Sequence, residues 1–206
     1  MNLSEALETG LDAMHQVLSA KQKVALLKYL TLLEKWNKTY NLTAIHGPER
    51  MLTHHILDSL ALTPYVNPGT LLDVGSGAGL PGVPLAIVRP DLFVTLMDAS
   101  QKKCGFMQQA AIELQLANIS VVHARVESYR AAQPYLQIVS RAFSDLSEFV
   151  RLSGHLLAPG GVWLAMKGIH PRDEIAQLKA AQVVRALPLL VPGLNAERSL
   201  IVMEPL

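Results

Sequence analysis

The first third of the chain carries its apolar residues three or four positions apart, which is the spacing of a helix face. This pattern predicts two amphipathic helices, then a third that follows Pro48 and ends before Pro64. No strand pattern occurs here, so we expect residues 1–66 to form a helical cap that closes over the edge of a following domain. The apolar positions are Leu3, Leu7, Leu11, Met14 and Leu18, then Leu26, Leu30, Leu33 and Trp36, then Leu52, Ile56 and Leu60.

From Thr70 onward, short apolar runs alternate with helical patterns, which is typical of a parallel sheet covered by helices. The last two runs are joined by the turn sequence PGLN at 192–195 and predict a closing hairpin. We expect residues 67–206 to form the α/β core, packed with the cap into one compact unit. A short helix is expected at 173–179. The predicted strands are 71–74, 93–97, 119–123, 136–139, 162–166, 183–191 and 200–203.

The first predicted strand runs into the glycine-rich sequence DVGSGAGLPG at residues 73–82. Gly75, Gly77 and Gly79 predict a turn, because glycine lets a ligand approach the backbone and adopts positive φ without penalty. The spacing of Gly77, Gly79 and Gly82 also satisfies G-x-G-x-x-G. The glycines alone therefore leave a dinucleotide-binding module open as an alternative.

Two acidic residues at strand ends favour a nucleoside cofactor that carries an ammonium group. Asp73 precedes the first glycine by two residues, where a carboxylate suits an ammonium group better than a pyrophosphate. S-adenosylmethionine has this ammonium group and no phosphate. The alternative is that Asp73 caps the following turn, although asparagine or serine could do this equally well. Asp98 ends the second strand, where it can accept both ribose hydroxyls or cap the next helix. We favour the cofactor contact at both positions.

Residues after the later strands extend this candidate site, because the carboxyl ends of parallel strands meet at one edge. Val126 and Glu127 follow the third strand, where backbone and carboxylate can hold an adenine amino group. Arg141 follows the fourth strand and can bind a cofactor carboxylate or a substrate phosphate, the alternative being a surface ion pair. Lys167 and Arg198 are candidates for reading a base carbonyl oxygen. Candidates for phosphate contacts, equally explained as solvated charges, are Lys102, Lys103 and Arg172.

The residues that several methylation reactions need are missing. Methylation of an exocyclic base amine commonly uses Asn or Asp followed by two prolines after the fourth strand, where this chain has Ser140, Arg141, Ala142 and Phe143. Cys104 lies in a predicted helix and lacks the adjacent proline of pyrimidine carbon-5 chemistry. Nitrogen 7 of guanine already has a free lone pair, so it needs alignment with a sulfonium methyl and no general base.

Composition adds limits to this picture. The 206 residues suffice for one sizeable core, and no apolar run reaches the roughly 18 residues of a membrane span. The start of the chain lacks a signal-peptide pattern and the lone cysteine fits a reducing compartment, so we expect a cytoplasmic protein. A net charge of +1 gives no bulk argument for nucleic-acid binding. His54 and His55 are adjacent and cannot share a helix face, so we expect no metal site and one histidine pointing inward.

Seven ordered motifs resemble one family over nearly the whole chain. They are WNKTYNLTAI (36–45), HHILDSL (54–60), DVGSGAGLPGVPLAIVRP (73–90), RVES (125–128), SRAF (140–143), LAMKG (164–168) and ERSLIVM (197–203). The chain is similar in these to the ribosomal RNA small-subunit methyltransferase G family, also called the glucose-inhibited division protein B family. QKKCGFM (101–107) is less basic than the family pattern, and Ser199 stands where histidine is often found.

The resemblance implies a class I S-adenosylmethionine-dependent methyltransferase, with a Rossmann-like, mostly parallel seven-stranded sheet and an N-terminal helical cap. The implied reaction is methylation of nitrogen 7 of a guanine in 16S ribosomal RNA, at RNA position 527. The expected partner is that RNA, within the small subunit or an assembly intermediate, and the expected state is a monomer. The alternatives are a methyltransferase of this fold acting on a small molecule or protein, and a non-catalytic dinucleotide sensor. Cofactor contacts are implied at Gly75, Leu80, Val126, Glu127 and Arg141.

Overall fold

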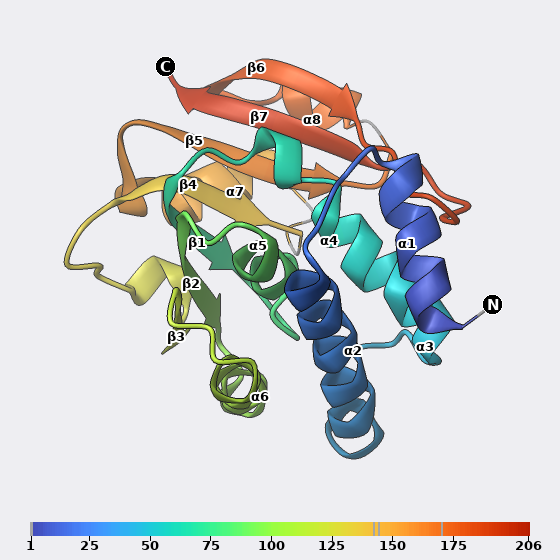
Figure 1. The fold of residues 1–206 in the computed structure, drawn as a ribbon. Coiled ribbons are helices and arrows are strands. Elements are labelled where there is room, and N and C mark those ends of the chain that lie inside the picture. The colour runs from blue at the N-terminus through green and yellow to red at the C-terminus, as the bar shows by residue number, and fades with distance from the viewer. Residues whose placement is uncertain (1, 142, 144, 170) are drawn as a thin grey trace.

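The structure is a computed structural model that describes residues 2–141, 143, 145–169 and 171–206 (Figure 1). Its seven strands are β1 (Gly69–Val74), β2 (Leu92–Asp98), β3 (Ile119–His123), β4 (Tyr135–Ser140), β5 (Leu157–Lys167), β6 (Ala181–Pro188) and β7 (Ser199–Pro205). They form one sheet in the order β3-β2-β1-β4-β5-β7-β6. Among these described strands, β7 alone runs in the direction opposite to the others. The predicted Rossmann-like, mostly parallel seven-stranded sheet is confirmed.

The helices before the sheet begin with side-chain caps. Asn2 and Glu5 form a capping box at the first helix, and Ser19 and Gln22 form another at the second. The first helix is shorter than expected and excludes Leu18, because the chain turns at His15, which has a positive φ of 54°. These helices are α1 (Leu3–Ala13), α2 (Ala20–Tyr40), α3 (Pro48–Met51), the π-helical η1 (Leu52–Leu57), α4 (Asp58–Leu60) and the 3-10 turn η2 (Thr63–Tyr65).

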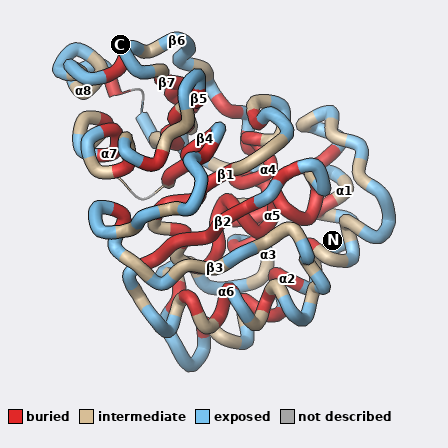
Figure 2. Tube along the Cα trace, turned by 90° about the vertical axis from the view of Figure 1, so that its left-hand side faces the viewer, coloured by how far each residue is buried: buried red, intermediate tan, exposed pale blue. Residues whose placement is uncertain are grey.

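The later helices cover the two faces of the sheet. They are α5 (Gly82–Val88), α6 (Gln101–Glu113), α7 (Leu146–Ser153) and α8 (Arg172–Ala176), with the 3-10 turns η3 (Val126–Ser128) and η4 (Gly154–Leu156). Successive strand residues point to opposite faces. Leu71 therefore packs in a core with α1, α2, α5 and α6, whereas Leu72 packs on the other face with α7. Figure 2 shows the buried residues concentrated along the central strands.

The N-terminal helices lie mainly against helices on one sheet face rather than over the sheet edge. Helix α2 packs on α5 and α6, and α4 packs on α5. Tyr29 donates a hydrogen bond to the Ala78 carbonyl, and the ring centroids of Trp36 and Phe106 lie 5.6 Å apart. Residues 2–66 thus share a hydrophobic core with the sheet, and residues within the segment 42–55 reach the carboxyl edge.

The C-terminal hairpin is confirmed, but its connection is longer than predicted. β6 ends at Pro188 and β7 begins at Ser199, and the two strands pair antiparallel. Leu189 and Val191, which we expected in the strand, lie in the connection and are buried in the core shared with the cap. An apolar run does not by itself distinguish a strand from a buried loop. Helix α8 also ends earlier than expected, at Ala176. No helix in the described ranges is long and apolar enough to cross a membrane.

Candidate functional site

Three adjoining hollows lie along the carboxyl edge, beside the point between β1 and β4 where the strand order reverses. This is where ligands bind in open α/β sheets. The strand-end hollow, about 370 Å³, is lined by Val74, Gly75, Met97, Asp98, Ala99, Ala124, Arg125, Val126, Glu127, Phe143, Glu148 and Leu152. The glycine-loop hollow, about 170 Å³, is lined by Leu42, Thr43, Gly75, Ser76, Gly77, Ala78, Leu80 and Arg141. The basic hollow, about 350 Å³, is lined by Ile45, His54, His55, Arg141, Met166, Lys167, Gly168 and Arg198.

Two predicted residues connect these hollows. Gly75 lines both the strand-end hollow and the glycine-loop hollow, and Arg141 lines both the glycine-loop hollow and the basic hollow. The three hollows therefore follow one another along the sheet edge. All of the predicted cofactor-binding residues except Asp73 line the first two hollows, and Lys167 and Arg198 line the third.

Ser76 fixes the glycine loop to the sheet. Its buried hydroxyl donates to the Asp73 carbonyl at 2.8 Å and accepts from the Met97 N–H at 3.0 Å. Its own carbonyl accepts from the N–H groups of Gly79 and Leu80. This role of Ser76 was not predicted from the sequence, although a small hydroxyl residue between two glycines directly after a buried strand is a signal for it.

The first and last glycines of the G-x-G-x-x-G pattern, Gly77 and Gly82, have different surroundings. Gly77 has φ of +60°, and a Cβ atom there would find only the Gly75 carbonyl, at 3.9 Å. A Cβ on Gly82, in contrast, would overlap Leu96 and lie 2.8 Å from the Asp73 carboxylate. Gly77 thus leaves open space in the hollow, while Gly82 lets helix α5 pack against the sheet.

Asp73 lies beneath the loop rather than on the wall of a hollow. It is fully buried, and its Oδ2 accepts from the Gly82 N–H at 2.9 Å, which anchors the start of α5. Its Oδ1 has no hydrogen-bond partner within the described part of the chain. Burial raises the pKa of Asp73 to about 7, against the lowering effects of the Gly82 N–H and of Arg141. Its contact with an ammonium group stays a prediction.

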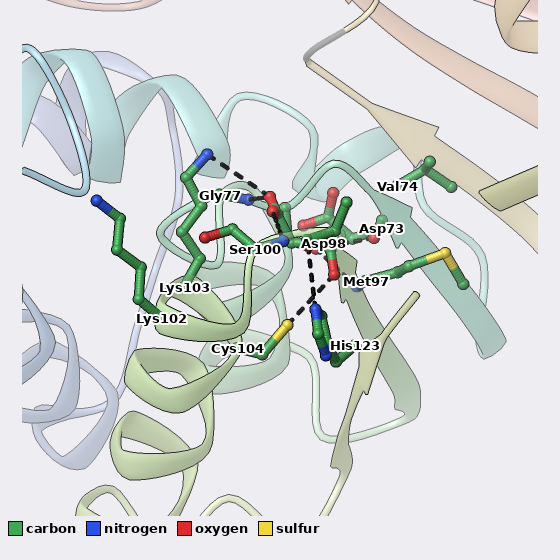
Figure 3. A network of polar contacts seen from close by, with 12 residues as sticks. Asp73, Val74, Gly77, Met97, Asp98, Ser100, Lys102, Lys103, Cys104 and His123 are labelled. Carbon is green, nitrogen blue, oxygen red and sulfur yellow. Dashed lines mark hydrogen bonds and ion pairs between the residues drawn. The ribbon is translucent and has the colours of Figure 1, made fainter. Parts of the chain in front are cut away.

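Asp98 joins the glycine loop to the start of α6 (Figure 3). Its Oδ2 accepts from the Gly77 N–H at 2.9 Å and its Oδ1 from the Ser100 N–H at 2.8 Å. Ser100, rather than Asp98, occupies the N-cap position of α6. Each carboxylate oxygen has two lone pairs, so Asp98 can keep both bonds and still accept two ribose hydroxyls in the strand-end hollow.

The lysines proposed for phosphate contacts make contacts within the protein. Lys103 Nζ lies 3.8 Å from Asp98 Oδ2, and Lys102 Nζ donates to the Tyr40 carbonyl at 2.8 Å. Figure 3 shows both side chains leaving the same end of α6. Arg172 is exposed at the start of α8 and lines none of the three hollows.

Apolar side chains complete the strand-end hollow around Val126 and Glu127. Met97 and Leu152 line it, together with Phe143, whose ring stacks on Phe149 at 5.2 Å. These walls suit the flat faces of an aromatic ring such as adenine. These apolar side chains were not predicted as site residues, although Met97 stands next to the predicted strand-end residue Asp98. Ala142, the neighbour of Arg141 in the chain, lies outside the described residues.

The arginines of the basic hollow share one buried carboxylate. Arg141 Nη1 donates to Asp58 Oδ2 at 2.8 Å and to the His54 carbonyl at 3.1 Å. Arg198 Nε donates to Asp58 Oδ1 at 2.8 Å. Arg141 therefore forms an ion pair, which was the alternative considered for it, but with a fully buried carboxylate rather than at the surface. Its contact with a cofactor carboxylate or a substrate phosphate stays a prediction. Lys167 Nζ lies 2.7 Å from Glu174.

His55 points inward and His54 is half-buried, as the sequence predicted for one of the pair. The His55 Nδ1 lies 3.0 Å from the His54 carbonyl, which only accepts, so Nδ1 carries the proton. Nε2 then accepts from the Thr43 hydroxyl at 3.0 Å. Burial, and next the charge of Arg141, lower the pKa of His55 to about 4. His55 is thus a neutral residue at pH 7. Neither Thr43 nor Asp58 was predicted as a site residue from the sequence. Asp58 nevertheless lies inside the motif HHILDSL at 54–60.

Known proteins match both the sequence and the fold. A sequence model of the family described as rRNA small subunit methyltransferase G matches residues 22–201. The ribosomal RNA small subunit methyltransferase G of Laribacter hongkongensis is 53% identical over 202 residues, with 98% of each chain covered. The Methylobacillus flagellatus protein of that name is 51% identical over 199 residues, with 97% of each covered.

Among solved structures, a SAM-dependent methyltransferase from Thiobacillus denitrificans in complex with S-adenosyl-L-homocysteine superposes with a TM-score of 0.58. The match covers 84% of this chain and 98% of that chain, at 15% identity. At this identity the likeness establishes the fold, which is the class I methyltransferase fold expected from the sequence.

Proposed function

Because this chain belongs to the rRNA small subunit methyltransferase G family, we propose that it transfers the methyl group of S-adenosylmethionine to nitrogen 7 of a guanine in 16S ribosomal RNA. The observation that carries this proposal is the continuity of the three hollows through Gly75 and Arg141. A cofactor lying along the first two hollows ends its methionine half beside Arg141, at the entrance to the basic hollow. A guanine in the basic hollow then lies next to the transferable methyl group.

The residues present fit S-adenosylmethionine. Gly77 leaves room for close approach of a ligand to the loop backbone, and Gly75 and Leu80 line the same hollow. Asp98 offers its remaining lone pairs to ribose hydroxyls. Val126 and Glu127 lie on the wall of the strand-end hollow, where the adenine would be held. When bound, the cofactor supplies an electrophilic methyl group on a sulfonium.

The protein's own contribution is orientation and exclusion of water. Nitrogen 7 attacks with its own lone pair, so no side chain has to remove a proton first. The basic hollow presents Arg141, Lys167 and Arg198 toward a base carbonyl oxygen and phosphates. His55 stays neutral at pH 7 and adds no further charge there. We also propose a cytoplasmic monomer without a metal that acts on the small subunit or an assembly intermediate.

The direct test is methyl transfer from labelled S-adenosylmethionine to 16S RNA and to small-subunit particles from a strain lacking the modification. We expect one 7-methylguanosine after nuclease mapping. Absence of methyl transfer to both substrates would contradict the proposal. Raising the salt concentration separates the alternative substrates, because binding through RNA phosphates weakens steeply with salt and binding of a neutral small molecule does not.

A further inference from the structure

A buried carboxylate that lines none of the three hollows described above connects two arginines of the basic hollow. Asp58 begins α4 and has 0% of its side chain exposed. Each of its oxygens accepts one charged hydrogen bond of 2.8 Å, Oδ2 from Arg141 and Oδ1 from Arg198. The three residues come from distant parts of the sequence: the N-terminal helices, the end of β4, and the connection before β7.

The two arginines, unlike Asp58, retain accessible surface. The exposed fraction of the side chain is 26% for Arg141 and 24% for Arg198, and both line the basic hollow. One carboxylate between two guanidinium groups leaves one net positive charge on the cluster. A guanidinium group has five N–H donors, so each arginine can hold Asp58 and still donate to a ligand.

Sharing one carboxylate also fixes the arginines relative to each other. Arg141 has a second fixed partner, the His54 carbonyl at 3.1 Å, and Arg198 Nη1 donates to the Glu197 carbonyl at 3.1 Å. Long flexible side chains lose much rotamer freedom when they bind a ligand. Here most of that loss has already occurred in the folded protein, which favours binding in one geometry.

We propose that Asp58 is a positioning residue: it holds Arg141 and Arg198 at the spacing in which their outward N–H groups together bind the carbonyl oxygen of the target guanine and its neighbouring phosphate. This proposal rests on the function proposed above and adds a residue that touches neither RNA nor cofactor. The arginines bind; Asp58 acts through them.

The test compares Asp58→Asn, Arg198→Met and the double variant in methyl transfer to small-subunit RNA. Asparagine keeps the shape of Asp58 but turns an NH₂ group toward one guanidinium. We expect Asp58→Asn to lower kcat/KM for RNA by about tenfold or more. The kcat/KM of the double variant should lie no more than about threefold below that of the less active single variant, because both substitutions disrupt the same contact between Asp58 and Arg198. Wild-type activity in Asp58→Asn, or fully additive losses, would overturn the proposal.

A matched control separates positioning from stability. Leu60→Ala removes a fully buried side chain of the same helix α4, and Leu60 is not a member of either ion pair. We expect it to lower the melting temperature and to keep kcat/KM for RNA at temperatures where it is folded. A loss of kcat/KM in Leu60→Ala equal to that in Asp58→Asn would assign the effect to general destabilisation.

A second comparison holds even if Asp58→Asn does not fold. Arg198→Lys keeps the positive charge but cannot hold the carboxylate and the substrate in the same planar fork. We expect the kcat/KM of Arg198→Lys for RNA to lie within about threefold of that of Arg198→Met, and wild-type activity in the lysine variant would overturn the proposal.

The Nε–H NMR signal of Arg198 gives a readout independent of activity: this proton should exchange slowly with solvent in the wild type. A wild-type protein inactive on RNA would remove the proposed function itself, whereas an active wild type with an unaffected Asp58→Asn would remove only the positioning role.

Discussion

At the scale of single residues, neighbouring polar groups at the sheet edge have separate tasks. Asp98 and Gly75 line the strand-end hollow, whereas Asp73 anchors the loop from beneath. Ser76 lines the glycine-loop hollow and also fixes the loop to the sheet. Sequence position predicts that Asp73, Gly75 and Asp98 belong to one site, because the carboxyl ends of parallel strands converge. It did not tell us which of them face the ligand, because this depends on which way each side chain is turned.

Gly77→Val tests the open space above the loop. Valine at φ of +60° is strained, and its branched side chain would enter the glycine-loop hollow. We expect cofactor affinity to fall by more than about tenfold, measured by calorimetry with S-adenosylmethionine. Gly105→Ala is the control, because a Cβ there meets nothing within 4 Å and the residue lies in helix α6. Wild-type affinity in Gly77→Val would contradict the assignment of the loop.

Arg141→Ala is expected to cost stability as well as activity. From sequence alone, this change would leave folding intact, but the guanidinium partners buried Asp58. The remaining bond from Arg198 satisfies only one carboxylate oxygen, so we expect a loss of about 1–3 kcal/mol in the free energy of unfolding. Urea denaturation measures it. An unchanged midpoint together with lost methyl transfer would show that water replaces the arginine without cost.

At the scale of elements, the connection between β6 and β7 is where the sequence prediction failed most. Its residues 189–191 are apolar, as in a strand, but Leu189 and Val191 pack into the core shared with the N-terminal helices. The Leu189 N–H also donates to the Arg198 carbonyl at 2.8 Å. Packing thus sets the path of a loop that carries an arginine of the basic hollow, and a local pattern cannot reveal packing between distant segments.

A pair of neighbouring leucines tests this connection. Leu189 is 7% exposed and Leu190 is 65% exposed, so only the first loses buried contacts when replaced by alanine. We expect Leu189→Ala to reduce the free energy of unfolding by about 2–5 kcal/mol and Leu190→Ala to change it by less than about 0.5 kcal/mol. Guanidinium denaturation of both variants measures the difference. Equal midpoints would place Leu189 outside the core.

At the scale of the whole molecule, the sheet was predictable because its strands are strongly apolar and regularly spaced. The Asp58 cluster was not, since it joins residues 58, 141 and 198, which only the complete fold brings together. The same holds for Tyr29, whose hydroxyl reaches the glycine loop from the N-terminal helices. Long-range polar contacts leave no periodic signal in the sequence.

Two buried titratable groups give the whole protein opposing responses to pH. Burial raises the pKa of Asp73 to about 7, so folding favours its protonated form and this contribution to stability declines as pH rises from about 4 to about 7. Burial lowers the pKa of His55 from 6.5 to about 4, so its contribution declines as pH falls through that range.

Single variants should separate these responses. Relative to the wild type, Asp73→Asn should lose stability more steeply as pH falls from 6.5 toward 4, and His55→Gln should gain stability on the same change. For each variant, the slope of the free energy of unfolding against pH should differ from that of the wild type by up to about 1.4 kcal/mol per pH unit, which is the limit for one proton. Urea denaturation at several pH values measures both curves. Parallel curves for all three proteins would mean that neither group is shifted.

The shared core of the N-terminal helices has a consequence for synthesis. The ribosome makes α1 and α2 before any strand exists, yet their buried leucines complete their core with residues of α5 and α6. Until those helices have emerged, the apolar stripes of α1 and α2 face water or a chaperone. The nascent chain is therefore most exposed to aggregation before residue 113, the end of α6, has left the exit tunnel. Slowing translation of the segment that precedes residue 113 should lower the yield of folded protein.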